Sequence, residues 1–106
     1  MPPACDPGWV FNPNTVIDGI TFDVVYFTDQ SGAWVNVGFS VDGPGNPQVS
    51  QPTVIGDSPP YVGYFAWRAS VWGQQPGQLD LEFGENCNPS CQLVSTCSIL
   101  VDPSPY

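Results

Sequence analysis

The sequence predicts an all-β protein, an antiparallel β-sandwich of the jelly-roll or immunoglobulin-like type with about six to eight short strands. Three observations support this fold class. No window of a dozen residues shows the i, i+3, i+4 apolar repeat of a helix. Apolar residues alternate instead with a period of two, and the 13 prolines and 11 glycines cluster between the alternating runs. Parallel strands would need crossover segments that this chain lacks.

A chain of 106 residues is expected to form one domain. We expect an extended N-terminal arm over residues 1–14, a β-sandwich over residues 15–101 and a C-terminal tail over residues 102–106. Trp9 and Phe11 make the arm too apolar for a free tail. The arm would either pair with its own sheet or add a strand to a neighbouring sheet, with the two aromatic side chains in the neighbour's pockets.

The first strands follow from the alternation. A short strand is expected at residues 16–17. Residues 20–28 and 34–41 alternate most regularly, and a turn at residues 29–32 separates them. These two segments are therefore predicted to form a hairpin.

The second half of the chain is interpreted in the same way. Residues 42–60 are rich in Pro and Gly, so an edge strand at residues 53–55 is expected between two loops, because proline is tolerated at sheet edges. Three longer strands are then expected at residues 61–72, 78–83 and 92–101. In residues 78–83 the apolar and polar side chains alternate without interruption.

The charge balance excludes several classes of partner. Arg68 is the only basic side chain, against ten acidic residues, and the net charge is -9. One guanidinium cannot form a phosphate-binding surface, so neither nucleic acid nor an anionic membrane surface is an expected partner. No apolar run reaches the ~18 residues that a membrane helix needs, so no membrane insertion is expected.

The four cysteines, Cys5, Cys87, Cys91 and Cys97, are expected to form two disulfides in a pairing that the sequence leaves open. Zinc is the less favoured alternative, because the spacing lacks a C-x2-C knuckle and the chain has no histidine. Disulfides are typical of oxidising compartments, so we expect the protein to be extracellular or on a virion surface.

No catalytic site is predicted. The chain has no histidine, no lysine and no glycine-rich phosphate loop. Asp80 and Glu82 would project from one strand face about 7 Å apart, within the range of a glycosidase pair, but a solvated strand face explains them better. No cofactor is required, and calcium is the only one that the carboxylates suggest. Its candidate ligands are Asp80, Glu82 and Glu85, or Asp42 with nearby carbonyl groups, and neither set has EF-hand spacing.

The aromatic residues suggest an interaction surface. The alternation assigns one set of apolar side chains to the core: Phe22, Phe39, Phe65 and Leu81. It places four aromatic side chains on the outer faces of their strands: Phe27, Trp34, Tyr64 and Trp72. Monomers rarely expose a patch of that size, so it would contact another subunit or stack on sugar rings, unless long loops cover it.

The sequence therefore favours a non-enzymatic structural subunit that self-assembles or decorates an extracellular filament or a virus particle. Its partners would be other copies of itself or a capsid or filament lattice. The candidate contact residues are Trp9, Phe11, Phe27, Trp34, Tyr64 and Trp72. The alternative is a small carbohydrate-binding or adhesive module that binds glycans through the same aromatic residues. The assembly hypothesis predicts that deletion of residues 1–12 leaves a folded domain that no longer assembles.

Overall fold

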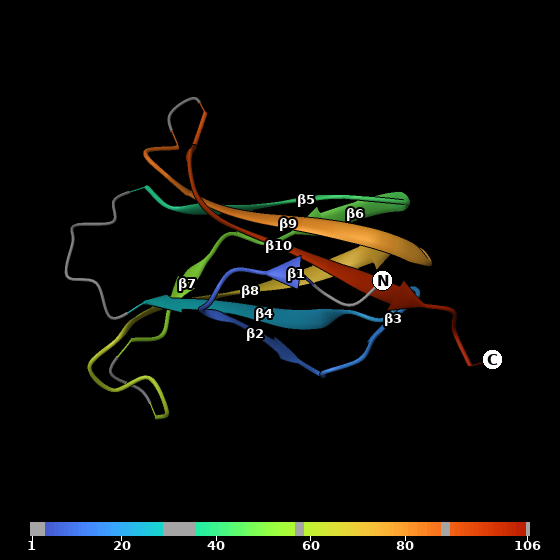
Figure 1. Ribbon diagram of the computed structural model, residues 1–106, viewed down its shortest axis with the longest axis horizontal. Helices are drawn as coiled ribbons and strands as arrows, with labels where there is room; N and C mark the ends of the chain where they lie inside the picture. The colour runs from blue at the N-terminus through green and yellow to red at the C-terminus, as the bar shows by residue number, and fades with distance from the viewer. Residues whose placement is uncertain (1–3, 29–35, 57–58, 88–89, 106) are drawn as a thin grey trace.

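A computed structural model describes residues 4–28, 36–56, 59–87 and 90–105 of the chain. These residues form ten strands and no helix, which confirms the predicted β-sandwich (Figure 1). The strands are β1 (Ala4–Cys5), β2 (Trp9–Asn12), β3 (Val16–Ile17), β4 (Phe22–Thr28), β5 (Gly38–Asp42), β6 (Gly45–Val49), β7 (Thr53–Val54), β8 (Phe65–Gln74), β9 (Gly77–Glu85) and β10 (Gln92–Asp102). Within the described ranges there is no helix that could cross a membrane.

The strands form two sheets that pack as layers. Sheet A has the order β1-β10-β9-β5, and β3 runs parallel to the end of β10. Sheet B has the order β2-β4-β8-β6, and β7 also pairs with β8. Figure 1 shows β5, β9 and β10 in one layer and β2, β4 and β8 in the other. In the described part of the chain, every strand pair other than β3 with β10 is antiparallel.

The core lies between the facing sides of the two sheets. On β9, Leu79, Leu81 and Phe83 are fully buried and alternate with more exposed polar residues, as the sequence predicts. Their counterparts in sheet B are the buried side chains of β4 and β8, including Val24 and Val71. The Phe83 ring contacts three other aromatic rings, with centroid distances of 4.6, 5.0 and 5.1 Å to Tyr26, Phe39 and Trp67.

The predicted hairpin of residues 20–28 and 34–41 is wrong. β4 pairs with β2 and β8 in sheet B, whereas β5 pairs with β9 in sheet A. Alternation of apolar and polar residues indicates that one face of a strand is buried, but it does not indicate which sheet the strand belongs to. The expected turn at residues 29–32 lies outside the described residues.

Residues 42–60 contain one strand more than expected. β7 is the predicted edge strand beside β8. β6 also pairs with β8 although it contains Pro47, and the register shifts between Gly45 and Gln48. An edge position tolerates Pro47 because the N–H that proline lacks is not needed by a further strand.

The N-terminal arm belongs to its own sandwich. β1 pairs with β10, so that Cys5 lies opposite Cys97, and β2 pairs with β4. Trp9 packs against Tyr26 and Phe39, with ring centroids 5.4 and 5.8 Å apart. Phe11 shares this inward face and contacts Phe22 at 6.2 Å. Both aromatic side chains of the arm therefore pack against their own sandwich.

A small polar network holds the arm against β10. Trp9 Nε1 donates a hydrogen bond to Ser95 Oγ (2.8 Å), and this hydroxyl donates to Asp6 Oδ2 (3.2 Å). The backbone N–H of Thr96 donates to the same carboxylate oxygen (3.0 Å). Ser95 is 3% exposed, and a buried hydroxyl group is stable only when it is hydrogen-bonded. These hydrogen bonds therefore satisfy the Ser95 side chain.

The cysteines form the disulfides Cys5–Cys97 and Cys87–Cys91, which confirms the expected oxidation. The second bond lies over two glycines, Gly38 and Gly84, that face each other across β5 and β9. A Cβ atom at Gly84 would lie 2.5 Å from Cys91 Cβ, so a larger residue has no room there. Two disulfides are the expected state of a protein in an oxidising, extracellular environment.

Candidate functional site

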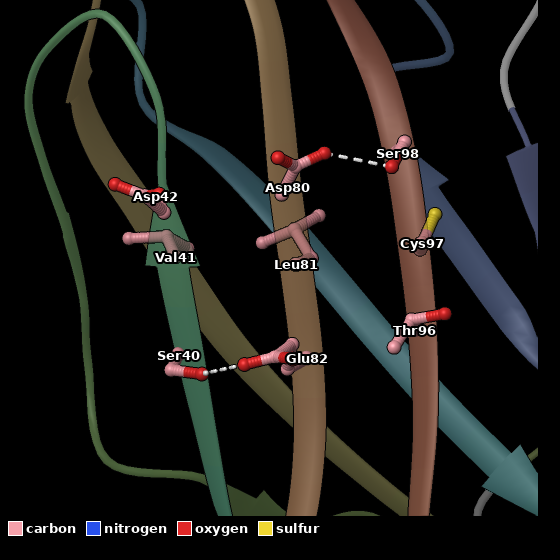
Figure 2. A pocket seen from close by; sticks show the side chains of 9 residues that line it. All are labelled: Ser40, Val41, Asp42, Asp80, Leu81, Glu82, Thr96, Cys97 and Ser98. Atoms are coloured by element: carbon pink, nitrogen blue, oxygen red, sulfur yellow. Dashed lines mark hydrogen bonds between the residues drawn. The ribbon is translucent and has the colours of Figure 1, made fainter. Parts of the chain in front are cut away.

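A polar groove of about 520 Å³ crosses the outer face of sheet A (Figure 2). Every second residue of three neighbouring strands contributes a side chain to it, because successive side chains of a strand point to opposite faces. The polar lining residues are Ser40, Asp42, Asp80, Glu82, Thr96 and Ser98. The strand register places Asp42 and Ser98 on either side of Asp80, and Ser40 and Thr96 on either side of Glu82.

We call this groove the acidic groove, and two of its carboxylates, those of Asp80 and Glu82, accept hydrogen bonds from their neighbours. Ser98 Oγ and Gln78 Nε2 donate to Asp80 Oδ1 at 2.7 and 2.9 Å. Ser40 Oγ donates to Glu82 Oε1 at 3.4 Å (Figure 2). The hydrogen bond from Ser98, and then that from Gln78, lowers the pKa of Asp80. Asp80 is therefore negatively charged at neutral pH.

Asp80 is unsuited to the role of a glycosidase's general acid. That role needs a carboxyl group whose pKa is raised, so that it still carries a proton near neutral pH. The pKa of Asp80 is lowered instead, by donors that stabilise the carboxylate. The lowered pKa therefore argues against Asp80 as the proton donor of such a pair.

The three candidate calcium ligands do not come together. Glu85 lies an odd number of residues from Asp80 and Glu82 along β9, so it points to the opposite face of the sheet. Among the residues that the structure describes, no group of three acidic or cysteine side chains could hold a metal ion. The alternation that pairs Asp80 with Glu82 thus separates both from Glu85.

The hydrogen bonds of Asp80 lead to a test of its charge. A group with a lowered folded-state pKa contributes stability above its unfolded value of about pH 4, and this contribution is lost as the pH falls through the folded-state pKa. We expect Asp80→Asn to lower the free energy of unfolding slightly at pH 7 and to have a smaller effect at about pH 2. Urea unfolding at both pH values measures the difference.

Ser98→Ala is the matched control for this test, because it removes the main cause of the lowered pKa. It should reproduce most of the pH dependence that Asp80→Asn shows. An equal loss of stability at both pH values in Asp80→Asn would mean that the charge of Asp80 contributes nothing.

The six aromatic contact residues predicted from the sequence do not form one surface. Trp9 and Phe11 pack against the core, and Trp34 lies outside the described residues. Phe27 contacts Tyr64 with a ring-centroid distance of 5.4 Å. Trp72 is 41% exposed and lies towards the other end of β8, opposite Gln48. A continuous aromatic platform is therefore not present in the described part of the chain.

Tyr61, which the sequence did not suggest as a contact residue, covers part of the surface on which Phe27 was expected to be exposed. Its ring packs on Phe27 at a centroid distance of 5.2 Å. The segment between β7 and β8 carries Tyr61 onto the outer face of sheet B, and Ala66 beneath is fully buried. A covering loop was one of the explanations that the sequence allowed for the outward aromatic residues.

The described residues nevertheless expose several apolar side chains in β7, in the segment before β8 and at the first residue of β8. Figure 1 shows β7 and the start of β8 at the same end of the sandwich. We call this group the apolar end cluster; its members are Val54, Val62, Tyr64 and Phe65, together with the half-buried Phe27, whose ring contacts Tyr64. Exposure is 71% for Val54, 62% for Val62, 42% for Phe65 and 39% for Tyr64. No charged residue occurs in residues 59–67.

The exposure of Phe65 corrects its expected place in the core. Phe65 lies two residues before the buried Trp67, so both side chains are expected on the same face of β8. Phe65 is, however, the first residue of the strand. It lies opposite Thr28, the last residue of β4. The end of a strand can extend beyond the facing sheet. Alternation along the strand therefore does not by itself predict that a side chain at its end is buried.

No protein-family model matches the chain, and neither a curated protein nor a solved structure shows significant similarity to it.

Proposed function

We propose that the protein is a non-enzymatic structural subunit that self-assembles, or that decorates an extracellular filament or a virus particle. The observation that carries this proposal is the apolar end cluster. Monomeric proteins seldom expose contiguous apolar patches, and those that do often use them as contact sites. Phe and Tyr are enriched in such contacts, whereas charged residues are depleted at their centres.

The low charge of the chain supports the same proposal. Only 10% of the residues are charged, compared with about 25% in average soluble proteins. Burying a weakly charged surface in a contact between subunits costs less desolvation free energy than burying a charged one. The acidic groove lies on the opposite sheet, so a contact through the apolar end cluster leaves its carboxylates in solvent.

This contact differs from the one that the sequence suggested. Trp9 and Phe11 pack within their own sandwich, so exchange of the N-terminal arm between subunits is no longer the favoured mechanism. A contact between preformed surfaces needs no strand to leave its sheet. The proposed subunit therefore folds first and assembles afterwards.

Val62→Asp tests the proposal. Val62 is 62% exposed, so the substitution should leave the fold intact while it places a charge within the apolar end cluster. We expect the wild-type protein to form assemblies larger than the 11.4 kDa monomer, and Val62→Asp to weaken the association at least about tenfold. Light scattering and negative-stain images of the same samples measure both.

Ile20→Asp is the matched control, because Ile20 is 52% exposed and lies beyond the other end of β4. It adds the same charge and should assemble like the wild-type protein. A wild-type protein that stays monomeric at high concentration would contradict self-assembly. Unchanged assembly of Val62→Asp would exclude the apolar end cluster as the contact.

A further inference from the structure

A second groove, of about 310 Å³, lies on the outer face of sheet B. Its lining residues come from β2, β4, β8 and the segment between β7 and β8: Val10, Asn12, Asp23, Val25, Ile55, Pro59, Tyr61 and Arg68. The register aligns Val10, Val25 and Arg68 in one row across three strands, and Asn12 and Asp23 in a neighbouring row. Residues far apart in the sequence therefore form one concave surface.

The polar groups of this sheet B groove are planar and carry paired hydrogen-bonding atoms. Arg68 contributes the only guanidinium of the chain, a rigid fork of donors. Asp23 contributes a carboxylate whose Oδ1 accepts a hydrogen bond from Ser70 Oγ at 2.9 Å, which fixes its orientation. Asn12 adds both a donor and an acceptor. Groups of this kind can each bind two adjacent hydroxyls.

The remaining lining is apolar. Tyr61 and Pro59 contribute flat surfaces, and Val10 and Val25 contribute aliphatic ones. A small-molecule site typically combines such a lining with a few fixed polar groups in a volume of roughly 300–1,000 Å³. The groove has this composition and lies at the lower end of that volume range. Its ligand should therefore be small and should carry both C–H faces and several hydroxyls.

We propose that the sheet B groove binds a neutral saccharide. One guanidinium and one carboxylate leave the groove without net charge, and the whole chain carries -9, which disfavours anionic ligands. Arg68, Asp23 and Asn12 hydrogen-bond the sugar hydroxyls, while Tyr61 and Pro59 contact the C–H face of the ring. The polar groups of the groove lie outside the apolar end cluster, and the groove borders that cluster where Tyr61 contacts Phe27.

The single arginine provides a direct measurement. Because Arg68 is the only arginine, its Nε–Hε group gives one assignable signal in a ¹⁵N correlation spectrum. The probes are neutral oligosaccharides of glucose, galactose, mannose, xylose and N-acetylglucosamine, together with an acidic oligogalacturonate. We expect at least one neutral probe to shift the Arg68 signal in a saturable way.

Variants then locate the site. Arg68→Lys keeps the charge but removes the fork, and Asp23→Asn keeps the shape but removes the charge; each should weaken the binding about tenfold. Glu82→Gln, on the opposite sheet, is the control and should bind like the wild-type protein. Because Arg68→Lys has no arginine signal, a titration followed in the backbone spectrum measures the binding of every variant, and the same spectrum reports whether the variant is folded.

Three results would overturn the proposal. The first is no shift of the Arg68 signal with any neutral probe up to about 10 mM, a concentration at which even weak binding is measurable. The second is a shift with oligogalacturonate alone, which would identify a site for anions. The third is saturable binding that Arg68→Lys and Asp23→Asn leave unchanged, which would place the sugar elsewhere.

Discussion

Deletion of residues 1–12 is expected to leave a chain that does not fold. The deletion removes β1 from sheet A and β2 from sheet B, together with the Trp9 side chain between the layers. It also removes the Cys5–Cys97 disulfide, which joins residues 92 positions apart and stabilises the fold by about 4.6 kcal/mol in the chain-entropy model. Domains of this kind have a total stability of about 5–15 kcal/mol. Circular dichroism and thermal unfolding measure the result.

The double variant Cys5→Ala, Cys97→Ala separates the disulfide from the strands. It keeps β1 and β2, so it should still fold, with a lower melting temperature than the wild-type protein. If the deletion variant unfolds cooperatively and is only impaired in assembly, the arm is dispensable for folding. The structural role assigned to it would then be wrong.

Phe83→Ala is expected to destabilise the domain by about 3–5 kcal/mol, the usual cost of removing a large buried aromatic side chain. Phe83 is 0% exposed, and its ring lies among those of Tyr26, Phe39 and Trp67. The cavity would open at the centre of this aromatic group, where neither sheet can close it without breaking ring contacts. Urea unfolding measures the loss.

Phe65→Ala is the control, because it removes the same ring from a position that is 42% exposed. We expect it to cost about 1 kcal/mol or less, since exposed positions contribute little to stability. Equal losses in the two variants would show that the Phe83 environment contributes no more than a surface position.

The fold class was predictable because it depends on local patterns. The strict alternation around Leu79, Leu81 and Phe83 correctly identifies the buried face of β9. The same kind of pattern in residues 20–28 and 34–41 suggested a hairpin that does not form. Alternation depends on neighbours along the chain, whereas the choice of sheet depends on partners that are far away in sequence.

The grooves were predictable only in part, for a related reason. The alternation along β9 correctly placed Asp80 and Glu82 on one face of the strand. Asp42 and Ser98 lie beside Asp80 only because β5 and β10 pair with β9 in a particular register, which the sequence does not show. The sheet B groove combines side chains from four separate segments, and no local motif connects them. Tyr61 was missed because the strand predicted at residues 61–72 begins with it, whereas β8 begins only at Phe65 and Tyr61 lies in the segment before that strand.

The pairing of β1 with β10 limits the order in which the strands can pair while the chain is being synthesised. A nascent chain emerges from its N-terminus, so the first described strand must wait for the last before it can pair. All strands of sheet B precede β9 and β10, so that sheet can form first, with its apolar inner side uncovered. Cys5 likewise cannot form its native disulfide until Cys97 has emerged. Closure of the sandwich and of its long-range disulfide can therefore begin only after β10 has been synthesised.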